Sequence, residues 1–281
     1  MQTAPYSICL NGQVLTLRTP RVMGILNITP DSFYQQSRMG SVQQAVDAAG
    51  QMALEGATFI DIGGQSTRPG ATLLPWQQEA ERIVPVVAAI AKHIPQVFIS
   101  VDTFYAPVAK AGVEAGAHLI NDVSAGNMDW EMLTTVGRLQ VPYVCMHMQG
   151  TPATMQQAPA YQHVVTDILD YFIAKLAACR QAGITDVLID PGFGFGKTMA
   201  HNFQLLHGLE AFHVLECPLL IGLSRKAMVY KTLQITAPEA LNGTTVLHTL
   251  ALLKGAHILR VHDVKEAVQA IALLQACQQH Q

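Results

Sequence analysis

The stretch L-E-G-A-T-F-I-D-I-G-G, residues 54–64, joins two kinds of segment. Before Gly56 the chain is rich in Ala, Gln, Glu and Leu at helical spacing, and after it comes a short aliphatic and β-branched run. Glycine accepts the left-handed backbone conformation that ends a helix, so the stretch predicts a helix that feeds a strand. The same junction recurs at 114–117, 181–183 and 254–256.

Eight apolar runs alternate with helical stretches along the chain. They cover residues 22–29, 58–64, 97–103, 118–124, 142–147, 186–192, 218–224 and 258–263. Strands that are apolar on both faces are typical of parallel strands covered by helices. Eight strand–helix units predict an α/β fold, a (β/α)8 TIM barrel. A doubly wound open sheet is the alternative, because periodicity does not show closure.

An N-terminal preamble, residues 1–20, precedes these units. Asn11-Gly12 stands between alternating apolar residues, a pattern that predicts a small β-hairpin, which we expect to cover the floor of the barrel. No linker or low-complexity segment interrupts the chain, so we expect one domain over residues 1–281.

Composition excludes several classes of protein. Of the 281 residues 50% are apolar and 13% are charged, which allows a large core, and the net charge of −3 argues against a nucleic-acid partner. The five cysteines show no C-x-x-C spacing and are expected to be reduced thiols. No apolar run approaches the roughly 20 residues of a membrane span, and no signal peptide is evident. We expect a cytoplasmic protein without a membrane partner.

Polar residues follow all eight runs. In a (β/α)8 barrel the carboxyl ends of the strands form the catalytic face, so these side chains should gather on one rim. They are Asn27, Thr29 and Asp31; Asp61; Asp102; Asn121 and Asp122; His147; Asp190; Ser224, Arg225 and Lys226; and Arg260, His262 and Asp263. Each alone could be a helix cap or a loop residue, but together they predict a polar binding site. For His147 we favour a structural hydrogen bond over catalysis.

The rim residues divide by charge. Asp102, Asn121 and Asp190 should project, partly desolvated, into the barrel mouth, where they would suit the paired N–H groups of an amino-heterocycle. Hydroxyls, turn amides and cations suit a phosphate, and they lie at 66–70, 224–226, Arg260 and His262. This pattern predicts a substrate with a nitrogen-rich ring and a phosphorylated arm. The alternative is that the cations only pair with the carboxylates.

The run D-P-G-F-G-F-G-K-T, residues 190–198, looks like a nucleotide-phosphate loop. A Walker-type loop needs a glycine where Pro191 stands, and the glycine spacing does not match the dinucleotide-binding pattern. We therefore expect Asp190 to be the functional residue, with glycines that let the backbone turn close to what it holds. Lys197 could still meet a phosphate.

Eight motifs follow one another along the chain. They are G-I-L-N-I-T-P-D-S-F (24–33), D-I-G-G-Q-S-T-R-P-G (61–70), S-V-D-T (100–103), I-N-D-V-S (120–124), M-H-M-Q-G-T-P (146–152), D-P-G-F-G-F-G-K (190–197), S-R-K (224–226) and R-V-H-D (260–263). In this order they resemble the motifs of the dihydropteroate synthase family.

The resemblance implies a barrel enzyme, a homodimer that uses Mg2+. It would join p-aminobenzoate to 6-hydroxymethyl-7,8-dihydropterin diphosphate and release pyrophosphate. The implied pterin site is Asp102, Asn121, Met146, Asp190, Phe195, Gly222, Lys226 and Arg260. The implied diphosphate site is Asn27, Thr67, Arg260 and His262, with Asn27 also on Mg2+. The implied site for p-aminobenzoate, which sulfonamides imitate, is Phe33, Arg68, Pro69, Ser224 and Lys226.

Asp31, Arg68 and Lys226 are the candidate catalytic residues, and we hypothesise that Asp31 ties the first loop to the second through Arg68. The family usually has Glu where Gln65 stands. This change should leave phosphate binding intact but loosen the anchoring of the loop. Two alternatives share the pterin edge: a pterin-binding methyltransferase, which would not need the anion residues, and a pterin-binding protein without catalysis.

Overall fold

The computed structural model describes residues 6–28, 38–65 and 73–279. Eight parallel strands form its main sheet, in the order β8-β7-β6-β5-β4-β3-β10-β9. Their bounds are β3 (Arg21–Asn27), β4 (Phe59–Gly63), β5 (Phe98–Asp102), β6 (Leu119–Asp122), β7 (Tyr143–Met146), β8 (Val187–Asp190), β9 (Leu220–Ile221) and β10 (Ile258–Val261). A parallel bridge from Ile189 to Leu219 joins the two ends of this sheet. The sheet therefore closes, which confirms the barrel and makes the open-sheet alternative wrong.

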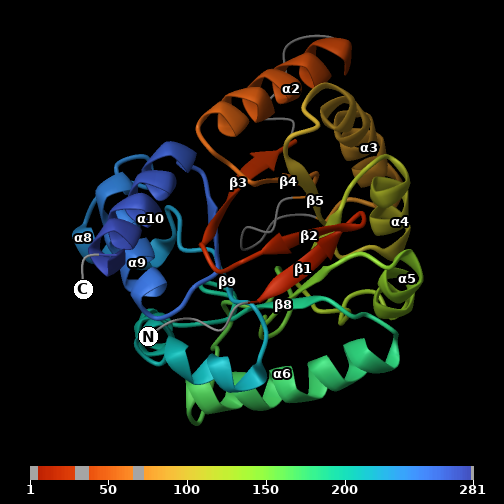
Figure 1. The fold of residues 1–281 in the computed structure, drawn as a ribbon. Helices are drawn as coiled ribbons and strands as arrows, with labels where there is room; N and C mark the ends of the chain where they lie inside the picture. Colours follow the sequence, from red (N-terminus) through yellow and green to blue (C-terminus); the bar gives the residue numbers. More distant parts are fainter. Residues whose placement is uncertain (1–5, 29–37, 66–72, 280–281) are drawn as a thin grey trace.

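Helices surround the barrel (Figure 1). They are α2 (Arg38–Leu54), α3 (Trp76–His93), α4 (Ala106–Glu114), α5 (Met132–Leu139), α6 (Val164–Gln181), α7 (Met199–His207), the 3-10 helix η1 (Leu209–Leu215), α8 (Ala227–Leu233), α9 (Leu241–Leu253) and α10 (Val264–Gln279). The four junction glycines, Gly56, Gly116, Gly183 and Gly255, all have φ between 82° and 114°. The left-handed helix ends predicted from the sequence are confirmed. Within the described part of the chain, no helix has both the length and the apolar character needed to cross a membrane.

The N-terminal hairpin closes one end of the barrel. Strands β1 (Ser7–Leu10) and β2 (Gln13–Thr16) pair antiparallel, and Asn11 and Gly12 take φ values of 48° and 77° in the turn between them. Its apolar residues Ile8, Leu10 and Leu17 are buried in one cluster with the first inward-facing residues of the barrel strands. Figure 1 shows β1 and β2 lying across the barrel. The predicted floor is confirmed.

Alternation along the strands turns this apolar floor into a polar mouth. Successive side chains of a strand point to opposite faces, so the residue two positions after each floor residue also points inward. The floor is formed by Phe59, Leu119, Leu188 and Ile258. Two positions later on the same strands stand Asp61, Asn121, Asp190 and Arg260, which form the next layer of the barrel interior. The barrel interior is apolar near the hairpin and polar near the carboxyl ends of the strands.

Candidate active site

The contacts around two glycines show that the predicted residues converge at the mouth. A Cβ added to Gly222 would lie 3.9 Å from Lys226 Nζ and 4.0 Å from both Arg260 Cβ and Asp190 Oδ2. A Cβ added to Gly63 would lie 3.6 Å from Asp102 Oδ2 and 3.7 Å from Asn27 Oδ1. Strands β3, β4, β5, β8, β9 and β10 thus bring acids, an amide and cations to one rim.

Arg260 is the centre of this rim. Its Nε donates to Asp61 Oδ2 and its Nη2 donates to Asp102 Oδ2, both at 2.6 Å. The side chain of Asp61 is fully buried, and those of Asp102 and Arg260 are 13% and 21% exposed. Burial opposes the charge on Arg260, but the two carboxylates outweigh it and raise its pKa. The alternative that cations pair with the carboxylates is therefore correct for Arg260.

Asp61 was expected on the rim from the sequence, but it was given no role in the predicted site. Besides Arg260, its Oδ2 accepts a hydrogen bond from Asn121 Nδ2 at 3.1 Å, and its Oδ1 is buried without a partner among the described residues. Because a carboxylate only accepts, the Asn121 amide must turn its NH2 group toward Asp61, which leaves Asn121 Oδ1 as an acceptor for a ligand. Its inward direction could have been inferred from the sequence, because it stands two residues after Phe59 in an apolar run.

Burial sets the protonation of the other pocket groups. It raises the pKa of Asp102 to about 7 against the opposing charge of Arg260. Burial also raises the pKa of Asp190. The charge of Lys226 and a 2.8 Å hydrogen bond from Gly192 N partly offset this rise. Burial lowers the pKa of Lys226 to about 8, although Asp190 acts in the opposite direction.

Apolar side chains form one wall beside these groups. Met146 is buried in a cluster with Phe104, Met148 and Met155, and Phe195 packs against this cluster. Lys226 Nζ lies 4.7 Å from the centre of the Phe195 ring and donates to the carbonyl of Phe193. A flat aromatic ligand would have both an apolar surface and hydrogen-bonding groups here.

Ser224 and His262 stand together at the cationic side of the rim. Ser224 Oγ accepts a hydrogen bond from His262 N at 3.2 Å and lies 3.0 Å from His262 Nδ1. Desolvation, followed by the charges of Arg260 and Arg225, lowers the pKa of His262 to about 4, even though much of its surface is exposed. His262 is thus neutral at pH 7 and offers an anion a hydrogen bond rather than a charge.

Two basic residues that the sequence suggested for anion binding instead bind groups inside the protein. Arg225 makes a two-pronged ion pair with Asp263, with Nη2–Oδ1 at 2.5 Å and Nε–Oδ2 at 3.0 Å. Lys197 is 3% exposed and its Nζ lies 2.9 Å from both His147 Nδ1 and Gly192 O. The suggestion that Lys197 could meet a phosphate is therefore wrong, because its donors are occupied inside the protein.

Lys197 and His147 instead fix the glycine-rich loop. Burial and then Lys197 lower the pKa of His147 to about 2, so the ring stays neutral, and burial also lowers the pKa of Lys197 well below its usual range. The structural role predicted for His147 agrees with this contact. A Cβ at Gly192 would lie 1.8 Å from His147 O, and one at Gly196 would lie 2.5 Å from Gln149 O. These two glycines serve close backbone packing against the segment after β7, rather than approach to a ligand.

Gln65 is held firmly at the end of β4. Its Oε1 accepts from Leu74 N at 2.9 Å, and its Nε2 donates to Leu74 O at 3.3 Å and to Glu79 Oε2 at 3.2 Å. The expectation that Gln65 loosens this anchoring finds no support at the two described ends of the loop. Asp31, Phe33, Thr67, Arg68 and Pro69 lie outside the described residues, so their predicted roles stay predictions.

Asn27 is the predicted metal ligand. It ends β3 and is exposed, and its Oδ1, like Asp102 Oδ2, lies near Gly63. Across residues 6–28, 38–65 and 73–279 no three His, Cys, Asp or Glu side chains are grouped to hold a metal ion. Mg2+ keeps several waters and takes one or two protein oxygens together with substrate phosphates, so the Asn27 oxygen fits Mg2+ that arrives with a phosphorylated ligand.

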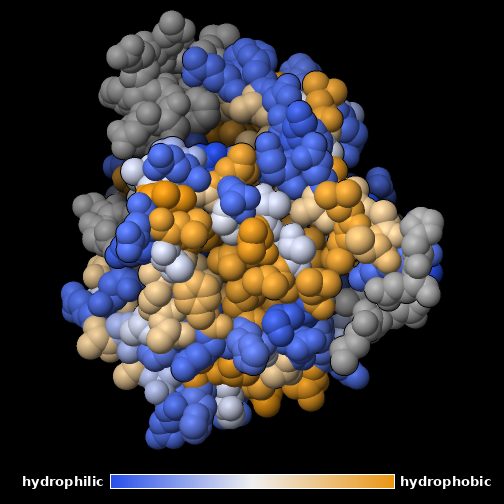
Figure 2. Space-filling view, turned by 90° about the vertical axis from the view of Figure 1, so that its left-hand side faces the viewer, coloured by the Kyte–Doolittle hydropathy of each residue, from blue (hydrophilic) through white to orange (hydrophobic). Residues whose placement is uncertain are grey.

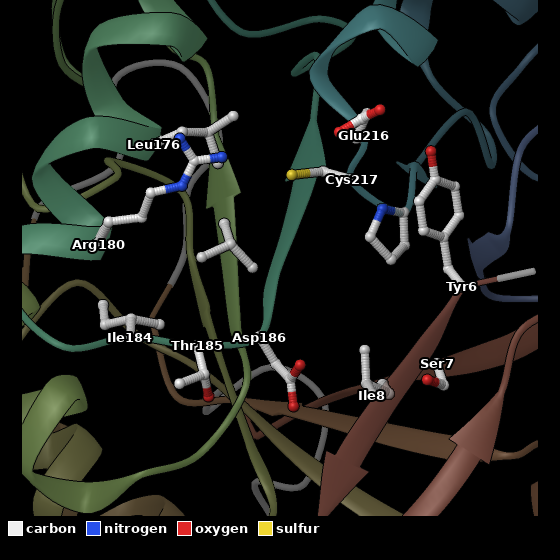
Figure 3. Close-up of a pocket in the computed structure, with 12 residues that line it drawn as sticks. Tyr6, Ser7, Ile8, Leu176, Arg180, Ile184, Thr185, Asp186, Glu216 and Cys217 are labelled. Atoms are coloured by element: carbon white, nitrogen blue, oxygen red, sulfur yellow. The ribbon is translucent and has the colours of Figure 1, made fainter. Parts of the chain in front are cut away.

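A cavity of about 190 Å³ lies at the other end of the barrel (Figure 3). Its lining includes Tyr6 and Ile8 beside the hairpin, Arg180 on α6, Asp186 before β8, and Cys217. None of the predicted site residues lines it, so it is separate from the polar mouth.

The sequence matches the family described as pterin binding enzyme over residues 23–262. The chain belongs to the pterin-binding enzyme family. A family relative from Escherichia coli (strain K12), named dihydropteroate synthase, is 45% identical over 267 residues, 94% of each chain. The Yersinia pestis dihydropteroate synthase, solved as a sulfonamide drug complex, is similar with a TM-score of 0.92 at 43% identity, covering 98% of this chain and 100% of that chain.

A third pterin-binding enzyme relative is the Xanthomonas albilineans dihydropteroate synthase, solved in complex with 7,8-dihydropteroate. Its TM-score is 0.87 at 39% identity, covering 97% of this chain and 99% of that chain. The similarity extends over nearly the whole chain, including the N-terminal hairpin.

We predict that Gly192→Ala destabilises the protein more than Gly183→Ala. Both glycines have positive φ, 71° and 82°, so both alanines carry a left-handed penalty of about 1–2 kcal/mol. Only the Gly192 variant also meets a backbone oxygen at 1.8 Å, whereas nothing lies within 4 Å at Gly183. We expect it to lose at least about 2 kcal/mol more in urea unfolding followed by circular dichroism. Equal midpoints would show that the loop and the segment after β7 separate freely.

Proposed function

We propose that this chain acts as a dihydropteroate synthase, joining p-aminobenzoate to 6-hydroxymethyl-7,8-dihydropterin diphosphate and releasing pyrophosphate. The observation that carries the proposal is the rim on which Asp102, Asn121 and Asp190 meet Lys226 and Arg260. The named relatives support it, since they cover nearly the whole chain and one holds 7,8-dihydropteroate.

The pterin would lie in the polar mouth. Asp102, Asp190 and Asn121 Oδ1 supply acceptors for the N–H groups of its aminopyrimidine edge, while Lys226 donates to a ring carbonyl and nitrogen. Met146, Phe195 and Gly222 would line the faces of the ring, and Arg260 would stack on it. Gly222 suits this role, because it lies among Asp190, Lys226 and Arg260 and adds no side chain to the space between them.

The diphosphate would lie toward the cationic side. Arg260 offers charge, neutral His262 and Asn27 offer hydrogen bonds, and Thr67 is the further predicted contact. We propose that Mg2+ binds here through Asn27 and the substrate phosphates, and when bound it would offset the negative charge that develops on the leaving group.

The reaction follows from these positions. The bond between the methylene carbon and the diphosphate oxygen breaks, with its electron pair leaving on pyrophosphate, while the electron-rich pterin ring stabilises the cationic methylene. The amine nitrogen of p-aminobenzoate, placed by Phe33, Arg68, Pro69, Ser224 and Lys226, then forms the carbon–nitrogen bond and loses a proton to solvent. No base needs to deprotonate the weak amine beforehand, so the protein contributes positioning and charge stabilisation. Asp31 would order the two loops through Arg68.

The activity assay separates this proposal from its rivals. We predict pyrophosphate release from the pterin diphosphate that requires p-aminobenzoate and Mg2+ and stops when the metal is chelated. A pterin-binding methyltransferase or a non-catalytic pterin-binding protein would bind a pterin in calorimetry without this release, and that result would refute the proposal. The substrates are small and water-soluble, which agrees with the cytoplasmic location that we infer.

We predict that Asp61→Asn weakens pterin binding without unfolding the protein. The isosteric amide removes the negative charge that holds Arg260 and leaves one neutral oxygen to accept from both Arg260 and Asn121. We expect roughly a 10- to 100-fold rise in the Kd for the pterin diphosphate, equivalent to the ~1.5–3 kcal/mol of a hydrogen bond to a charged group. Ser100→Ala is the control, because Ser100 is equally buried, pairs with Asp61 in the strand register, and has no hydrogen-bond partner among the described residues. An unchanged Kd for Asp61→Asn would show that Arg260 and Asn121 keep their positions without it.

We also propose a homodimer formed through α9 and α10. Figure 2 looks onto the side formed by α8, α9 and α10 and shows hydrophobic residues gathered across its centre. Val246, Leu250 and Leu253 follow one another at helical spacing on α9 and are 52%, 41% and 59% exposed, and Leu273 on α10 is 71% exposed. An exposed apolar stripe on two packed helices favours burial against a second copy.

We predict that Val246→Asp combined with Leu250→Asp converts the dimer into a monomer, measured by light scattering after gel filtration. The two charges would have to be buried without partners in the interface. Leu54→Asp on α2 is the control, because Leu54 is 84% exposed outside this stripe, and its mass should stay that of the dimer. A monomeric wild-type protein would refute the proposed assembly.

A further inference from the structure

Side chains hold every backbone carbonyl of the glycine-rich loop, residues 192–196, between β8 and α7. Two of the donors, Gln156 and Tyr161, belong to the segment after β7, and the others are lysines. Lys197 Nζ donates to the carbonyls of Gly192 at 2.9 Å and Phe195 at 3.1 Å, Lys226 Nζ to that of Phe193, Gln156 Nε2 to that of Gly194 at 2.8 Å, and the Tyr161 hydroxyl to that of Gly196 at 2.7 Å. The loop is therefore restrained at each of its residues.

The backbone of this loop sends its two phenylalanines to different places. Its three glycines have φ values of 71°, 82° and 62°, in the left-handed region that favours glycine. Phe193 is fully buried in the main core, whereas Phe195 is half-buried against the cluster that contains Met146. Lys226 Nζ lies 4.7 Å from the centre of the Phe195 ring, so this ring stands beside the polar groups of the mouth.

Lys197 is the buried anchor of the loop. It is 3% exposed, and its third contact, beside the two carbonyls, is His147 Nδ1 at 2.9 Å. An ammonium group has three N–H donors, and these three acceptors use all of them. A neutral amine keeps the same three contacts, because His147 then donates from Nδ1. In both forms Lys197 has no N–H left for a ligand, so it can act on a ligand only through the loop.

We propose that Lys197 is a positioning residue for the pterin, which it affects by holding the carbonyl of Phe195 and thereby the ring that forms one wall of the pocket. The inference rests on the proposed function for the identity of the ligand. Tyr161 holds the next carbonyl, that of Gly196, and should act in the same way. Its effect should be weaker, because it contributes one hydrogen bond from a half-buried position.

The test is a double-mutant cycle on the Kd for the pterin diphosphate, measured by calorimetry in the presence of Mg2+. Lys197→Met keeps an unbranched side chain but removes its donors, and we expect it to raise the Kd roughly tenfold. In a Phe195→Leu background, which lacks the ring, the same change should alter the Kd by less than about twofold. A residue that acted on the pocket by another route would weaken binding equally in both backgrounds.

Lys175→Met is the matched control. Lys175 Nζ also ties down a loop at the carboxyl end of a strand, through Ala125 O at 2.8 Å and Asn127 Oδ1 at 2.6 Å. That loop, residues 123–131, contains none of the predicted pterin contacts. We expect the Kd of this variant to match that of wild type, and urea unfolding shows whether each variant is folded under the conditions of the binding experiment.

A second variant decides the question if Lys197→Met does not fold. Tyr161→Phe removes a single hydroxyl and should raise the Kd roughly threefold, but only where the Phe195 ring is present. A folded Lys197→Met variant with an unchanged Kd would overturn the proposal. A rise that persists in the Phe195→Leu background, or an equal rise for Lys175→Met, would overturn it as well.

The proposed function fails by a different result. Wild-type protein that binds the pterin diphosphate but releases no pyrophosphate with p-aminobenzoate would refute the proposed function. The cycle needs binding only, so it would still decide whether Lys197 acts through Phe195.

Discussion

The rim depends on one charged group of three residues inside the barrel, Arg260 held between Asp61 and Asp102. A guanidinium that is largely buried needs compensating charge, and two carboxylates from β4 and β5 supply it. The same contacts decide which groups remain for a ligand: Asp61 fixes the Asn121 amide, and Asp102 keeps part of its carboxylate at the mouth. A strongly polar layer can therefore lie directly above an apolar floor without unpaired cations.

Charge is used in two ways around this site. Lys197 and Arg225 look like anion-binding residues in the sequence, yet they hold the glycine-rich loop and the end of β10 through carbonyls, His147 and Asp263. By contrast, nitrogen atoms remain at the rim for a ligand on Lys226, Arg260 and His262. Lys197 and Arg225 thus hold the segments that follow β8 and β9, from which the remaining groups act.

Much of the architecture could be predicted from local patterns. Each pattern reflects a local backbone preference. The strands form at the eight apolar runs, the helices end at the junction glycines, and the hairpin turns at Asn11-Gly12. Asp102, Asn121 and Asp190 could be placed at the mouth because they end apolar runs. Asp61 was listed with the rim residues but given no role, since it lies inside such a run, where the inward direction of a side chain depends on counting alternate residues from the floor. Asp122 shows the same limit: it adjoins Asn121 but points away from the barrel, where it accepts from Ser124, Gly126 and the Tyr143 hydroxyl.

The sequence by itself determined the parallel strands, the polar residues at their carboxyl ends and the family. These features depend on residue periodicity and on short motifs, which a sequence shows directly. Closure of the sheet, the partner of each cation and the contacts of Gln65 were decided only by the tertiary structure. Each of these depends on atoms from segments up to 199 positions apart, as in the contact of Arg260 with Asp61. The strength of a hydrogen bond falls within a few tenths of an ångström of added distance. A sequence pattern therefore does not specify which of several nearby carboxylates a buried cation will pair with.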